Sequence, residues 1–81
     1  MTVTVQLFAR ARELASAGSL TVQLRSDATV AELRHAIVER IPALAGIVAA
    51  SRIAVNLDFA DDQQTIRETD ELAVIPPVSG G

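Results

Sequence analysis

The sequence of 81 residues contains no cysteine, no lysine, no tryptophan and no tyrosine. Without cysteine it has no disulfide, no thiolate ligand for zinc or an iron–sulfur cluster, and no cysteine nucleophile or persulfide. All seven cationic side chains are arginine, so no ε-amine is present for an isopeptide bond or a Schiff base. These absences exclude a ferredoxin-type electron carrier, and we expect no metal site.

Charge and aromatic content argue against nucleic acid and membrane partners. The formal net charge is −3, the wrong sign for binding phosphates. Only Phe8 and Phe59 are aromatic, too few to stack bases. No apolar run approaches the ~18–20 residues that span a bilayer, and no basic leader opens the chain. We therefore expect a soluble, cytoplasmic protein.

The first quarter of the chain predicts two strands. Apolar and polar positions alternate over residues 2–8, which indicates a strand with one buried face. Phe8 falls on the polar face, where an exposed aromatic suits a contact surface. Residues 9–16 favour a short helix, with Gly18 as its stop. Alternation over residues 20–25 predicts a second strand, antiparallel to the first.

One main helix follows, and it begins with a capping signal. In Thr29-Val30-Ala31-Glu32 the Thr29 hydroxyl can accept from the Glu32 N–H while Glu32 reaches back to the Thr29 N–H. Pro42 ends the helix. The apolar stripe that we expect to face the sheet consists of Val30, Leu33, Ile37 and Ile41.

The second half predicts three more strands. Residues 43–50 predict a short irregular or helical connection. The run from Arg52 to Asp58 alternates, with Ile53, Val55 and Leu57 on one face, and residues 65–66 predict a very short strand. The last strand, 72–75, lacks alternation, which favours a central strand covered on both faces.

This order of elements predicts a single α+β domain over residues 1–81. A mixed sheet of four or five strands, with the main helix packed on one face, satisfies it. The first and last strands are then a parallel central pair, which is the β-grasp (ubiquitin-like) arrangement. Residues 78–81 are expected to be a flexible Gly-Gly tail.

The chain ends in two prolines and two glycines. Pro76 and Pro77 have no N–H and cannot continue a strand ladder. Glycine lacks Cβ, so a Gly80-Gly81 backbone can pass through a gap that a side chain would block. The tail is either a frayed end or a probe that enters the site of another protein. The stiff diproline after a buried strand favours the probe.

Four segments resemble the small subunit of molybdopterin synthase, a ubiquitin-like sulfur carrier. They are Leu7–Leu14 (LFARAREL), Thr29–Leu33 (TVAEL), Val55–Asn56 and Asp70–Gly81 (DELAVIPPVSGG). The resemblance covers essentially the whole length, and the diproline followed by Gly-Gly is its specific part. Thr69 departs from the pattern, because the family typically has glycine at this position. A β-branched residue resists positive φ, so the local turn geometry is expected to differ.

The resemblance implies chemistry at the Gly81 carboxylate. An E1-like adenylyltransferase would use ATP to adenylate it, and a sulfurtransferase would supply the sulfur of a thiocarboxylate. Val78, Ser79 and Gly80 would then insert with it into the synthase large subunit, in an expected heterotetramer. There the sulfur would pass to cyclic pyranopterin monophosphate for molybdenum cofactor biosynthesis. The chain shows no nucleophile–base set of its own and implies no permanently bound cofactor.

A docking surface is expected around the exit of the tail. Phe8, Ile75, Pro76 and Pro77 would form its apolar part, because the first and last strands are predicted neighbours. Phe8 lies out of phase with the apolar positions of its strand, which favours a role in docking. For Ile75, docking and a place in the core are equally balanced. Arg12 is expected near that edge, where it could pair with a carboxylate of the partner.

Rival interpretations share the fold. One is a sulfur carrier for thiamine or cysteine synthesis, or a ubiquitin-like protein modifier. Another is a non-catalytic β-grasp interaction module, for which the terminal carboxylate is dispensable. The segment from Phe8 to Glu13 and the Pro-Pro-Val-Ser ending favour molybdopterin synthesis.

The remaining titratable groups predict solvated contacts. His35 is the only histidine and falls four residues before Glu39, so we expect an i,i+4 pair on the helix surface. Asp58, Asp61 and Asp62 lack the spacing of a calcium loop and are expected in a solvated acidic turn.

Overall fold

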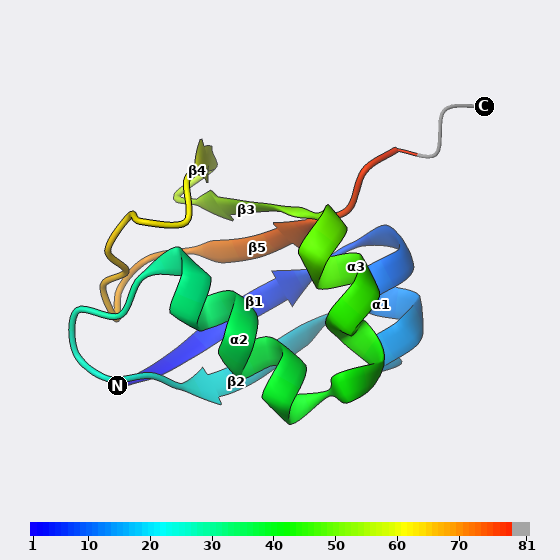
Figure 1. Cartoon of the computed structure of the whole chain (residues 1–81), viewed down its shortest axis with the longest axis horizontal. Coiled ribbons are helices and arrows are strands. Elements are labelled where there is room, and N and C mark those ends of the chain that lie inside the picture. Colours follow the sequence, from blue (N-terminus) through cyan, green and yellow to red (C-terminus); the bar gives the residue numbers. More distant parts are fainter. Residues whose placement is uncertain (79–81) are drawn as a thin grey trace.

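Five strands form one mixed sheet, and helices cover one of its faces (Figure 1). The structure is a computed structural model that describes residues 1–78, so the predictions for Ser79, Gly80 and Gly81 lie outside the described residues. The strands are β1 (Thr2–Leu7), β2 (Ser19–Gln23), β3 (Arg52–Val55), β4 (Asp58–Ala60) and β5 (Leu72–Ile75). The helices are α1 (Ala9–Ala15), α2 (Val30–Arg40) and α3 (Ala45–Ala50), with a 3₁₀ turn, η1 (Pro42–Leu44), before α3.

The strand order is β2-β1-β5-β3-β4, with β5 in the centre. β1 and β5 are parallel, and Val5 lies opposite Leu72 while Leu7 lies opposite Val74. The pairs β1–β2, β3–β5 and β3–β4 are antiparallel. The predicted α+β class, the mixed sheet and the parallel pairing of the first and last strands are therefore confirmed.

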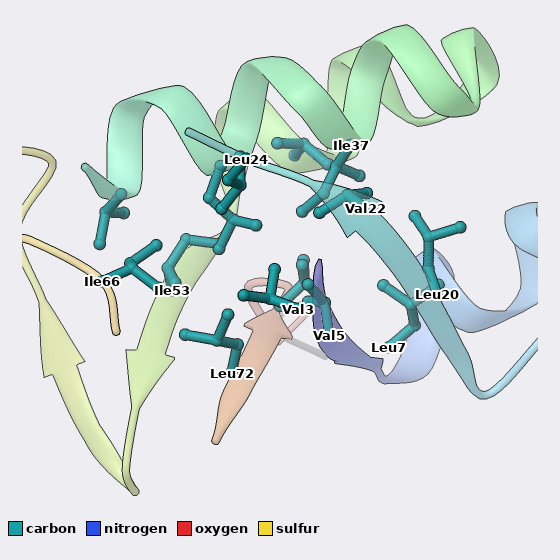
Figure 2. Close-up of a cluster of buried hydrophobic side chains, with 14 of the residues drawn as sticks. Val3, Val5, Leu7, Leu20, Val22, Leu24, Ile37, Ile53, Ile66 and Leu72 are labelled. Carbon is teal, nitrogen blue, oxygen red and sulfur yellow. The ribbon is translucent and has the colours of Figure 1, made fainter. Parts of the chain in front are cut away.

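The core lies between the sheet and the helices (Figure 2). Alternation along β1 buries every second side chain, and Val3, Val5 and Leu7 are at most 2% exposed. α2 contributes Val30, Leu33 and Ile37, as its stripe predicts, whereas the fourth predicted member, Ile41, follows the end of the helix and is only partly buried. Ile66 lies on a loop and belongs to no strand, but its side chain is buried in the core. Thr65 beside it makes only an isolated bridge to Thr29, so the strand predicted at 65–66 is reduced to that bridge.

The capping box of α2 is present as predicted. The Glu32 N–H donates to Thr29 Oγ1 at 3.3 Å, and the Thr29 N–H donates to Glu32 Oε2 at 2.7 Å. Arg25 also donates to both Glu32 oxygens, at 2.7 and 3.0 Å. The Arg25 hydrogen bond, followed by that of the Thr29 backbone, holds the pKa of Glu32 below its ordinary value. Contacts local to the sequence thus fix where the helix begins.

Two turns differ from the prediction. α1 ends at Ala15 and is capped by Ser16, whose φ of 53° is left-handed. No described glycine has a positive φ, so Gly18 is not the stop of this helix. The third strand ends at Val55 instead of continuing through Leu57. Asn56 and Leu57, with φ of 51° and 73°, form a tight hairpin into β4, and Leu57 is 89% exposed. The alternating pattern does not reveal this turn because neither residue is glycine.

We predict that Glu32→Gln lowers the free energy of unfolding most at neutral pH. Because the pKa of Glu32 is lower in the folded state, its ionised form stabilises the fold above the unfolded carboxyl pKa of about 4.3. That contribution is lost as the pH falls through the folded pKa. Urea titrations at several pH values should therefore show the two proteins converging in strongly acidic solution.

Glu68→Gln is the matched control for this measurement, since Glu68 is exposed and makes no ion pair within residues 1–78. A constant difference between wild type and Glu32→Gln at every pH would contradict the electrostatic explanation.

Candidate functional site

The face of the sheet opposite the helices is open at its centre. In β5, Leu72 and Val74 are buried in the core, but Ala73 and Ile75 on the other side are only half-buried. The prediction that both faces of this strand are covered is therefore wrong. A central strand without apolar–polar alternation has two apolar faces, and here one of them faces solvent.

Strand register places small residues in the middle of this open face. Ala73 lies between Gln6 on β1 and Ala54 on β3, and Ala54 in turn lies opposite Phe59 on β4. Methyl side chains at the centre and larger ones around them leave a groove of about 450 Å³. We call it the open-face groove, and its apolar lining includes Phe8, Ala54, Leu57, Phe59, Ala73 and Ile75.

The tail leaves the sheet beside one end of this groove. β1 and β5 are parallel, so Phe8, which follows Leu7, lies beside Ile75, which follows Val74. Both side chains line the groove, as the docking prediction for them requires, and Phe8 is 46% exposed. Figure 1 shows the described end of the chain, in red, running away from the sheet after β5.

The two prolines after β5 have different environments. Pro76 is two residues after Val74, so its ring points to the same side of the sheet as Val74 and is buried. Pro77 and Val78 are exposed. Pro76 therefore anchors the start of the tail, and of the described residues after β5 only Pro77 and Val78 have exposed side chains. A residue with fixed φ and a buried ring restrains the direction in which the following residues emerge.

Arg12 lies outside the open-face groove. Its side chain is exposed, and its guanidinium lies over the loop between α1 and β2, where a Cβ built on Gly18 would be 3.6 Å from Cζ. It does not line the groove together with Phe8 and Ile75. Arg12 follows Phe8 by about one helical turn of α1, and its guanidinium lies beside Gly18 instead of in the groove.

A polar network fixes the β3–β4 hairpin against the start of β5. Asn56 donates from Nδ2 to Asp70 Oδ1 at 2.9 Å and accepts from the Glu71 N–H at 2.9 Å. Asp70 Oδ2 also accepts from the Arg67 N–H at 2.8 Å. Thr69 in this turn has no positive φ, so its departure from the family pattern causes no backbone strain. The network holds Leu57 and Phe59 at the wall of the groove.

The sequence prediction missed four of the six apolar residues named above in the lining of the groove. Ala54, Leu57, Phe59 and Ala73 join Phe8 and Ile75 only when the strands pair. One signal was available: Phe59 is the second of two aromatic residues and follows directly on Leu57 and Asp58.

Asp61, Asp62, His35 and Glu39, which the sequence predicted to make solvated contacts, lie outside the groove. Asp62 pairs with Arg34 at 2.8 Å, and Asp61 Oδ1 accepts from the Gln63 N–H at 2.9 Å. The predicted pair of His35 and Glu39 is present, at 3.4 Å. Within residues 1–78, no three acidic or histidine side chains gather as a metal site would require, and no helix is long and apolar enough to cross a bilayer.

Comparison with known proteins gives consistent similarities. The model of the ThiS family matches residues 5–81. The chain is 37% identical to the molybdopterin synthase sulfur carrier subunit of Arabidopsis thaliana, over 98% of this chain and 82% of that protein. SAMP1 from Haloferax volcanii has a TM-score of 0.89 and 30% identity, covering all of both chains. A chain from the complex of subunits 1 and 2 of the molybdopterin-converting factor of Helicobacter pylori has the same fold, with a TM-score of 0.71 and 24% identity.

We predict that neighbouring residues Leu7 and Phe8 differ in their effect on stability. Leu7→Ala removes a side chain that is 1% exposed and should lower the free energy of unfolding by about 3 kcal/mol. Phe8→Ala removes a half-exposed ring and should cost about 1 kcal/mol or less. Urea denaturation of both variants measures the difference. Equal losses would show that Phe8 belongs to the core and would remove it from the docking surface.

Proposed function

Because this chain belongs to the ThiS family, we propose that it is the sulfur carrier subunit of a molybdopterin synthase and works in the cytoplasm. The observation that supports this most directly is structural. β5 lines an open apolar groove and leads through one buried proline to the exposed start of the tail. A carrier needs a docking surface near the start of its tail, and here the exposed Pro77 and Val78 follow directly on the strand that lines the groove.

In the proposed cycle the working group is the carboxylate of Gly81. A carboxylate is a poor electrophile, so an E1-like adenylyltransferase first joins it to AMP and releases pyrophosphate from ATP. A persulfide sulfur of a sulfurtransferase then attacks the acyl carbon and AMP leaves, and a second thiol reduces the resulting acyl disulfide, which releases the thiocarboxylate and leaves a disulfide on the donor side. The product is a thiocarboxylate, a better nucleophile than the carboxylate. It carries the sulfur on the end of the backbone, in accord with a sequence that has no cysteine.

The large subunit of the synthase is the proposed acceptor of the charged tail. Val78, Ser79 and Gly80 would enter its active site ahead of the body, and the two glycines allow passage through a narrow channel. There the sulfur would be transferred to cyclic pyranopterin monophosphate, and the carboxylate would be regenerated by hydrolysis. The heterotetramer belongs to this proposal.

In the proposed complex the open-face groove is where the partner body docks. Its lining is mostly apolar, and Phe59 is 53% exposed and Leu57 89% exposed in the isolated chain. Side chains of this kind, gathered on one face, are typical of interaction sites. The adenylyltransferase and the large subunit both receive the same tail, so both would contact this face in turn.

A second candidate is a ubiquitin-like protein modifier, favoured by the similarity to SAMP1 along the whole chain. A modifier would use the same adenylated carboxylate but pass it to a lysine of another protein, giving an isopeptide bond. The two functions differ in product. A carrier returns with a free end, whereas a modifier is recovered covalently attached to its target.

Loading of the tail is the first test of the proposal. Incubation with ATP, the adenylyltransferase and a sulfur donor should make the intact protein about 16 Da heavier, because sulfur replaces oxygen. Deleting Gly81, or adding one residue after it, should abolish this gain and leave the melting temperature unchanged. Glu68→Gln, on the exposed loop before β5, is the control and should load normally. A normal mass gain in either tail variant would contradict the proposal.

Filling the groove tests the docking surface independently of the tail. Ala73→Leu places a branched side chain on the groove floor and should weaken binding to the synthase large subunit at least about tenfold by calorimetry, which is about 1.4 kcal/mol. Ala43→Leu makes the same change at an exposed position of η1, outside the groove, and should bind within about twofold of wild type. Equal affinity of the two variants would place the interface elsewhere.

A further inference from the structure

Arg52 lies beside the exit of the tail, on the open face of the sheet. It is the first residue of β3 and lies directly opposite Ile75, the last residue of β5. Its neighbours in β3 alternate, with Ile53 in the core and Ala54 on the floor of the groove, so Arg52 shares the outward face with Ala54. The side chain is exposed.

The guanidinium of Arg52 lies over an aromatic ring. Its Cζ lies 3.8 Å from the centroid of Phe59, the residue that forms the β4 wall of the groove. A guanidinium at this distance over a ring is attracted by the negative face of the π-system. The contact holds the positive charge at the rim of the groove and restricts the rotamers of a long side chain.

Arg52 contacts no carboxylate in the part of the chain that the structure describes. Arg10, Arg25 and Arg34 each form an ion pair with a glutamate or an aspartate. The chain has ten acidic residues against seven arginines, so carboxylates are available in excess. Arg52 instead projects over an apolar surface, with its donors directed at neither Asp nor Glu.

From this geometry we infer that Arg52 determines docking specificity by receiving a carboxylate of the synthase large subunit at the exit end of the groove. A guanidinium has five N–H donors in one plane. Stacking on Phe59 occupies a face of that plane and leaves the edge to bind both oxygens of a carboxylate. This inference rests on the proposed function, because it names a residue of the same docking surface.

Docking would make this ion pair stronger than an ordinary surface pair. Pairs in water contribute little, because solvent screens them and two side chains must be ordered. Here Phe59 has already ordered the arginine, and a partner that covers the apolar groove excludes water around the pair. At the other end of the groove lies the exposed Glu71. A cation at one end and an acid at the other favour one orientation of a partner of complementary charge.

The test measures affinity for the synthase large subunit of the same organism at about 50 mM and about 300 mM NaCl. The variants are Arg52→Gln, which removes the charge, Arg52→Glu, which reverses it, and Arg52→Lys, which keeps the charge but loses the planar stack. Arg40→Gln and Arg40→Glu are matched controls, since Arg40 is the exposed last residue of α2, on the helical side of the sheet.

We expect Arg52→Gln to weaken binding about tenfold at low salt and Arg52→Glu about a hundredfold, with Arg52→Lys between Gln and wild type. The affinity of wild type should fall with salt more steeply than that of Arg52→Gln. The Arg40 variants should stay within about twofold of wild type. A purely structural role for Arg52 would change the melting temperature but not the salt dependence.

Equal affinity, or an equal salt dependence, for wild type and Arg52→Gln would overturn the role of Arg52. If wild type binds the large subunit and only the Arg52 prediction fails, the proposed function stands. If wild type does not bind at all, the proposed function and the inference fail together.

Discussion

The parallel pairing of β1 with β5 is the constraint on which the rest of the structure depends. It joins the first strand of the chain to the last described one at the centre of the sheet. Parallel strands cannot be joined by a tight turn, so the chain between them must cross over the sheet, and α2 does this on one face. Both strands then end at the same edge, which places Phe8 beside Ile75 and the start of the tail.

Because the helices cover only one face, the two sides of the sheet have different roles. The inward side chains of β1, β3 and β5 form a closed core with α2, and this core provides the stability. The outward side chains of β3 and β5 are small at Ala54 and Ala73, so the open face is concave at its centre. The same strands therefore hold the fold together and shape the groove, and a change on one face need not disturb the other.

The loops fix the positions of the side chains at the wall of the groove. Asn56 takes a left-handed conformation at the β3–β4 turn and, through Asp70 and Glu71, connects that turn to the beginning of β5. This arrangement keeps Phe59 at the wall of the groove and within stacking distance of Arg52. Charge and apolar surface are thus presented together by a hairpin of only a few residues.

Patterns local to the sequence were enough to predict β1, the capped start of α2, β5 and the β-grasp order, because alternation, capping and proline act over a few neighbouring residues. They also indicated that Phe8 is out of phase with the buried side of its strand. The groove itself was not predictable in this way. Its members Ala54, Phe59 and Ala73 are separated along the chain and meet only through strand register, while Leu57 changed from an expected core residue to an exposed one through a turn without glycine. Which face a side chain occupies depends on the pairing of distant strands, and that pairing is decided by burial of the whole core.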